Sequence, residues 1–68
     1  MNKIEKSFAR TFSCSAGEVV MKHLRKMTIE RVLGANATEP ELRTLEGQRA
    51  LVRQIEQLIE RGKSDVNT

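Results

Sequence analysis

Two residues of this sequence belong to the types that act as nucleophile and base, and each type occurs once. Cys14 precedes an apolar stretch with helical spacing, and a helix N-terminus favours the thiolate form of cysteine. His23 follows nine residues later, whereas a catalytic pair needs its side chains in hydrogen-bond contact. A helix start and two helical turns separate the two residues, and no third group is placed to orient the histidine. The sequence therefore predicts a structural cysteine, a solvated histidine and a protein that is not an enzyme.

Metal and cofactor sites are not predicted either. A structural zinc ion needs four ligands, which Cys14 and His23 cannot supply. A single cysteine excludes a disulfide within the chain and fits a reducing compartment. The glycines are isolated and lack the glycine-lysine context of a phosphate-binding loop. We therefore expect no cofactor and no metal.

Positive charge is the other chemical feature of the sequence. The net charge is +3, with seven Lys/Arg and three Glu in residues 1–34 and five Lys/Arg and six Asp/Glu in residues 35–68. An acidic partner or nucleic-acid phosphates would suit the first half, although a solvated basic face explains the asymmetry equally well. The candidate contacts are Lys22, Arg25, Lys26 and Arg31. No apolar run approaches the ~20 residues of a membrane span, so no membrane partner is expected.

The elements that must position these residues are predicted to be helices, in an all-α fold of three helices without a sheet. The first spans about residues 3–12, because Ile4, Phe8 and Phe12 recur every four residues on one side. So short a helix is unstable alone in water. We expect this helix to be stable only when its two phenylalanine rings pack against the rest of the protein.

The second helix is predicted from about residue 16 to residue 27. Ser15 and Glu18 have the spacing of a capping box at its start. Its apolar stripe consists of Val20, Leu24 and Met27.

The segment after this helix is ambiguous. If the helix continued to Leu33, then Ile29, Val32 and Leu33 would point away from its apolar stripe. The preferred interpretation ends the helix near residue 27 or 28 and turns Ile29 and one or both of Val32 and Leu33 inward. The alternative is a helix stopped by Gly34, whose second apolar face would be free to bind another chain.

The third helix is predicted from about residue 39 to residue 61. Thr38 and Glu41 form its capping box, and Gly62 is the expected C-terminal stop. Residues 1–62 would then form one helical domain, followed by a polar tail over residues 63–68. The predicted core of that domain consists of Phe8, Phe12, Val20, Leu24, Val52, Ile55 and Ile59.

The stretch "EGQR" places Gly47 inside the predicted third helix, and a glycine in a helix interior costs about 1 kcal/mol relative to alanine. We interpret Gly47, Gln48 and Arg49 as a notch where the helix receives another segment. A residue without a side chain admits a neighbouring backbone, and a buried glutamine needs hydrogen-bond partners. That segment is either the connector of the same chain, around residues 29–33, or another protein.

Two stretches together resemble a family of small proteins of tailed bacteriophages, typified by one from a Bordetella podovirus. The stretches are "FARTFSCSAGEVVMKHL" and "EGQRALVRQI". The family shares an F-x3-F pattern, a glycine and a short apolar helix, then a variable connector and a helix opening on a Glu-Gly-Gln/Arg-Arg motif. The resemblance covers about residues 8–59, although the connector here lacks the family's aromatic residues.

The resemblance implies a phage protein encoded in the virion structural and packaging gene cluster, with no agreed activity to carry over. It implies a non-enzymatic virion structural or assembly accessory that binds another phage protein through apolar helical surface. The partner would be a portal, adaptor, coat or internal protein, with several copies of this chain per particle and room for a homo-oligomer. The location would be the virion, or the host cytoplasm during assembly. The alternatives are a small basic DNA-binding packaging accessory and a phage-encoded inhibitor of a host protein.

Overall fold

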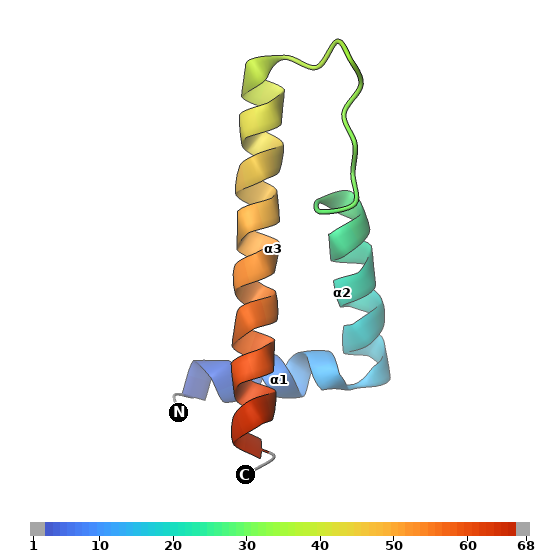
Figure 1. Cartoon of the computed structure of the whole chain (residues 1–68). Helices are drawn as coiled ribbons and strands as arrows, with labels where there is room; N and C mark the ends of the chain where they lie inside the picture. Colours follow the sequence, from blue (N-terminus) through green and yellow to red (C-terminus); the bar gives the residue numbers. More distant parts are fainter. Residues whose placement is uncertain (1–2, 67–68) are drawn as a thin grey trace.

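A computed structural model of the chain describes residues 3–66, which form three helices (Figure 1). They are α1 (Lys3–Ser13), α2 (Ser15–Met27) and α3 (Glu39–Val66). No strand occurs within the described residues, and the predicted all-α class, with two short helices and one long helix, is confirmed.

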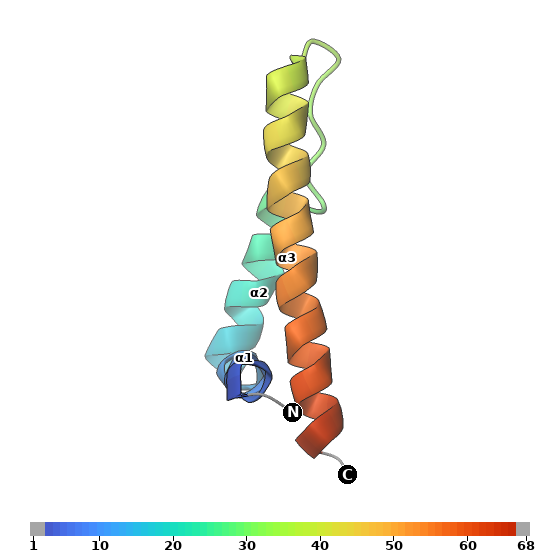
Figure 2. The same cartoon turned by 90° about the vertical axis from the view of Figure 1, so that its left-hand side faces the viewer.

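The three helices do not form a compact bundle. α2 and α3 run antiparallel, and α1 lies across their lower ends (Figure 1). Figure 2 shows α1 and α2 on the same side of α3, so the opposite side of α3 carries no other helix. The radius of gyration is 14.4 Å and the extents are 48 × 22 × 14 Å. A compact chain of 68 residues would have a radius of gyration of about 11 Å, so the molecule is elongated.

α1 crosses the last turns of α3 at close range at Gly62. A Cβ atom on Gly62 would lie 2.3 Å from the Glu5 carbonyl oxygen and 2.5 Å from the Ala9 Cβ. Gly62 has a helical backbone, without the positive φ of a C-terminal stop. The prediction that it ends the helix is therefore wrong, because its missing side chain serves the crossing instead.

The predicted polar tail also needs correction. α3 continues to Val66, so residues 63–66 are helical, while residues 67–68 lie outside the described part of the chain. The crossing at Gly62 places α1 beside this end of α3, which explains why the helix does not stop there.

A single residue, Cys14, separates α1 from α2. It takes the N-cap position of α2, with φ −80° and ψ 164°, and its Sγ accepts a hydrogen bond of 3.4 Å from the Gly17 N–H. Ser15 is already helical, so the predicted capping box of Ser15 and Glu18 is wrong. Gly17 packs so closely on α1 that an added Cβ would lie 2.1 Å from the Thr11 carbonyl oxygen. This contact fixes where α2 can begin.

The connector follows the preferred interpretation. α2 ends at Met27, and the alternative of a helix continuing to Leu33 is wrong. Ile29 and Leu33 are half-buried, whereas Val32 is 88% exposed, so one of the two later apolar residues turns inward.

Thr38 caps α3 as predicted. Its Oγ1 accepts a hydrogen bond of 3.3 Å from the Glu41 N–H. The Glu41 carboxylate in turn accepts a bond of 3.1 Å from the Thr38 hydroxyl, rather than reaching the Thr38 backbone.

The core is thin. Its buried apolar residues are Ala9, Leu45, Val52 and Ile59. The predicted core residues Phe8, Phe12, Leu24 and Ile55 are half-buried, and the two phenylalanine rings stack with centroids 6.3 Å apart. Val20 is 50% exposed, so its place in the predicted core is wrong. The reason is that α2 packs much less closely on α3 than α1 does.

Candidate functional site

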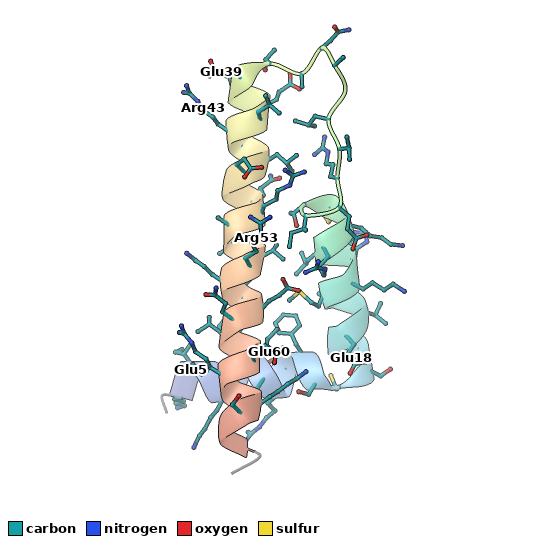
Figure 3. All side chains as sticks on the ribbon, in the orientation of Figure 1. Glu5, Glu18, Glu39, Arg43, Arg53 and Glu60 are labelled. Atoms are coloured by element: carbon teal, nitrogen blue, oxygen red, sulfur yellow. The ribbon has the colours of Figure 1, made fainter. Side chains whose placement is uncertain are left out.

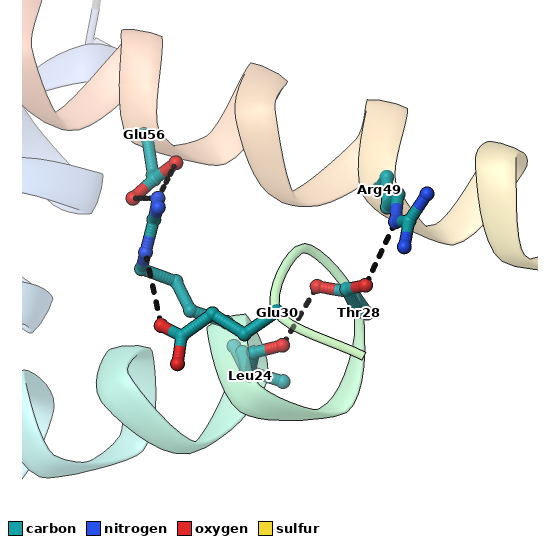
Figure 4. Close-up of polar contacts among 6 residues, drawn as sticks. Leu24, Thr28, Glu30, Arg49 and Glu56 are labelled. Carbon is teal, nitrogen blue, oxygen red and sulfur yellow. Dashed lines mark hydrogen bonds and ion pairs between the residues drawn. The ribbon is translucent and has the colours of Figure 1, made fainter. Parts of the chain in front are cut away.

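Polar side chains hold α2 beside α3. Nη1 of Arg25 donates to both carboxylate oxygens of Glu56, at 2.7 and 2.6 Å, and Nε of Arg25 lies 3.8 Å from a carboxylate oxygen of Glu30 (Figure 4). The Arg25 and Glu56 side chains are 38% and 30% exposed. This charged bridge links α2 to α3 without bringing their backbones into close contact.

A second polar bridge ties the connector to α3. Nε of Arg49 donates to the Thr28 carbonyl oxygen at 2.9 Å (Figure 4). Nη2 of Arg49 donates to the Arg31 carbonyl oxygen. Its Nη1 also donates to the Glu46 carboxylate at 2.6 Å. The guanidinium group gives these two carbonyl oxygens a charged donor, and its positive charge beside Thr28 suits the C-terminus of α2. Arg49 therefore fixes where the connector leaves α2.

The predicted notch is therefore only partly occupied from within the chain. Arg49 receives the connector, as the intramolecular interpretation required of this motif. Gly47 does not, because an added Cβ would meet no atom within 4 Å beyond its own helix. Gln48 is exposed. The intramolecular interpretation is thus wrong for Gly47, and contact of Gly47 and Gln48 with another protein stays a prediction.

Between the two bridged helices lies an open groove of about 490 Å³, which we call the apolar groove. Four apolar residues line it, together with two polar residues and one charged residue. The lining consists of Leu24, Met27, Thr28, Arg31, Gln48, Leu51 and Val52. Met27 is 51% and Leu51 is 58% exposed, so the groove presents large apolar side chains to solvent. Its exposed apolar lining suits it to binding a partner.

The four candidate cations do not form one cluster. Lys22 and Lys26 are exposed and lie one turn apart on α2. Arg25 is engaged by Glu56 and Glu30, and Arg31 lines the apolar groove from the connector. Two exposed lysines therefore remain together for a phosphate or an acidic partner.

The residues that could do chemistry are not brought together. Sγ of Cys14 contacts the Thr11 carbonyl oxygen and the Gly17 N–H, each at 3.4 Å, and His23 is exposed further along α2. Nine residues of helix correspond to about 13 Å of rise. Within residues 3–66, no three His, Cys, Asp or Glu residues are grouped so that they could hold a metal ion. None of the described helices is long and apolar enough to cross a membrane.

Sequence reasoning missed the two glycines that do allow close approach, Gly17 and Gly62. It assigned this role to Gly47 because Gly47 interrupts a strong helical pattern, whereas Gly17 lies near a helix start and Gly62 near an expected end. One feature of the sequence could have indicated a close helix crossing at Gly62. The small Ala9 on the first predicted helix could have matched a glycine on another helix, although nothing in the sequence says which one.

A comparison with models of protein families identifies the family of this chain. The family model of the Bbp19-like phage proteins matches residues 8–60, from the middle of α1 almost to Gly62. This chain belongs to the Bbp19-like phage protein family. The match includes α2, the connector, Arg49 and the lining of the apolar groove, so the groove lies wholly within the family region. No curated protein and no solved structure matches the chain.

Proposed function

We propose that the chain is a non-enzymatic accessory of phage virion structure or assembly, which binds another phage protein through apolar helical surface. The observation that supports this most is its excess of exposed surface. The accessible area is 5243 Å² for a mass of 7.7 kDa. Folded monomers of this mass expose about 4,300 Å². A protein with so thin a core is expected to gain stability when a partner covers it.

Exposed apolar side chains occur on every element. They are Ile4, Val19, Val20, Met27, Val32, Leu42 and Leu51. Single exposed apolar residues are normal, but larger apolar patches mark interaction sites. This distribution suits a small protein that is held between larger neighbours.

Membership of a phage family supports a role in the phage cycle. The resemblance to a protein of a Bordetella podovirus, encoded in the structural and packaging cluster, favours a portal, adaptor, coat or internal protein as the partner. We therefore place several copies in the virion, or in the host cytoplasm during assembly.

Protein analysis of purified particles tests this proposal. We expect more than one copy of the chain per particle, and cross-links from its exposed residues to one structural protein. Absence from particles, together with specific binding to one purified host protein, would overturn the proposal in favour of an inhibitor role.

One observation favours a DNA-binding role as the second candidate: Lys22 and Lys26 are exposed and adjacent on α2. Each phosphate contact adds about 0.9 to the slope of log affinity against log salt concentration. With Arg25 neutralised by Glu56, we expect a slope near two and no tight duplex binding at physiological salt. A markedly steeper slope that Lys22→Ala and Lys26→Ala each reduce would favour the DNA-binding role.

A further inference from the structure

The apolar groove is open to solvent, and we propose that a second copy of this chain covers it. In this dimer, α2 and α3 of each copy pack their groove faces together around a twofold axis, so that four helices enclose one shared core. The inference rests on the proposed function only in treating exposed apolar surface as binding surface.

Two uncharged rows include lining residues of the apolar groove and extend beyond it along α2 and α3. On α2, Val20, Leu24 and Met27 follow one another at intervals of four and three residues, which places them on one helix face.

The second row lies on α3, where Leu51 lines the groove. Gly47, Gln54 and Leu58 lie four residues before, three after and seven after Leu51, so they share its face. These are the intervals at which two helices pack along a seam. Each copy therefore offers two parallel seams.

The absence of charge from these rows argues for a second copy rather than for a charged partner. A twofold interface places one patch against itself, so any net charge in the patch repels its own image. Of the seven groove-lining residues only Arg31 is charged, and it belongs to the connector rather than to the facing rows. Arg25, the α2 cation nearest α3, is neutralised by Glu56. A strongly acidic or basic partner would find little to pair with here.

The excess accessible area of the chain matches the area that a dimer interface would bury. The chain exposes 5243 Å², about 900 Å² more than a folded monomer of its mass. A standard interface buries about 800 Å² on each partner. One self-contact over the groove face would therefore remove nearly all of the excess.

The dimer also gives the "EGQR" stretch a physical role. Gly47 has no atom within 4 Å of an added Cβ, so the backbone of another helix could approach there. Gln48 lines the groove and would find hydrogen-bond partners in the second copy. Four exposed apolar residues lie outside the two rows and stay available to another phage protein. They are Ile4, Val19, Val32 and Leu42.

Adjacent valines on α2 provide the sharpest test. Val19 and Val20 are 67% and 50% exposed, yet successive helix residues point about 100° apart, so only Val20 belongs to the groove row. Sedimentation equilibrium of the purified full chain measures its mass over a wide concentration range. We expect the wild type to reach twice 7.7 kDa, Val20→Glu to weaken the dimer at least about tenfold, and Val19→Glu to leave it unchanged.

A second pair of variants guards against misfolding of Val20→Glu. Leu51→Glu places a charge in the α3 row, whereas Val32→Glu changes a residue that is 88% exposed in the connector. Circular dichroism verifies that each variant keeps its helices. Dissociation by Leu51→Glu but not by Val32→Glu supports the groove interface.

A wild-type chain that stays monomeric at several hundred micromolar overturns the dimer. Equal weakening by Val19→Glu and Val20→Glu overturns the groove as its interface. Neither result bears on whether the chain occurs in particles, so failure of the dimer and failure of the assembly role can be told apart.

Discussion

At the scale of single residues, the glycines of α3 show how tertiary contact decides the effect of a side chain. Gly47 and Gly62 both lie inside α3, and both lack a positive φ. Gly62 meets the backbone of α1, whereas Gly47 meets nothing within 4 Å. The same substitution should therefore have opposite effects at the two positions.

Gly47→Ala should raise the free energy of unfolding by about 1 kcal/mol, because alanine favours the helix and no neighbour opposes its methyl group. Gly62→Ala should lower it by about 1–2 kcal/mol, because the overpacking at Glu5 and Ala9 outweighs the same helix preference. Urea denaturation of both variants at one low protein concentration measures the two changes. Equal stabilisation by both variants would contradict the crossing.

Arg49 is the second residue whose role depends on tertiary contact. Arg49→Met should lower the free energy of unfolding by about 1–2 kcal/mol, because the Thr28 and Arg31 carbonyls lose a charged donor. Amide exchange in the connector should become faster as well. Arg53→Met is the matched control, since exposed Arg53 makes no hydrogen bond or ion pair that the structure records. Equal effects of the two variants would mean that Arg49 does not fix the connector.

At the scale of the elements, each helix depends on how its ends are satisfied. The start of α3 uses the strong capping residue Thr38, whereas the start of α2 uses the weak acceptor Cys14. Glu39 and Arg43 lie on the side of α3 that points away from α2 (Figure 3). Nη2 of Arg43 lies 3.6 Å from Oε1 of Glu39. Both of these side chains are 78% exposed, so this pair contributes little to stability.

The weak cap of α2 makes a prediction. Cys14→Ser should raise the free energy of unfolding by about 0.5–1 kcal/mol, because a hydroxyl is a better acceptor for the Gly17 N–H than a thiol. Ser15→Ala should have almost no effect, since Ser15 lies inside the helix. Thermal melts of both variants test the assignment. A loss of about 1 kcal/mol in Ser15→Ala would restore Ser15 as the cap.

At the scale of the whole molecule, few contacts carry the stability. No large side chain among the described residues is fully buried, and α1 contacts α3 more extensively than α2 does. A small domain typically has only 5–15 kcal/mol of net stability, and one with so thin a core is expected near the lower limit. Loss of one core side chain should therefore unfold all three helices together.

Ile59 is 5% exposed, and we expect Ile59→Ala to cost about 2–5 kcal/mol. This loss would leave at most about 3 kcal/mol of stability, so Ile59→Ala should unfold at a much lower urea concentration than the wild type. Ile4→Ala removes the same atoms from a side chain that is 57% exposed and should cost much less. Urea denaturation followed by circular dichroism measures the free energy of unfolding of the two variants. Equal loss of stability in Ile59→Ala and Ile4→Ala would mean that the core lies elsewhere.

Local sequence was enough to predict that three helices form and where most of them begin and end, although not the cap of α2 or the end of α3. The four-residue repeat of Ile4, Phe8 and Phe12 gave the extent of α1, and Thr38 with Glu41 gave the start of α3. The opposed apolar faces around Ile29 gave the end of α2. These features depend on periodicity and on end groups within a few residues, which a sequence displays directly.

Tertiary structure alone decided which helix faces meet. The sequence could not show that Gly62 continues α3 and contacts Glu5, or that Arg49 binds carbonyls at residues 28 and 31. It could not show that α2 stands away from α3 and leaves the apolar groove open. The spacing of apolar residues gives each helix a face, but the pairing of faces depends on distances between segments far apart in the chain. In this molecule a glycine crossing and two arginine bridges set those distances.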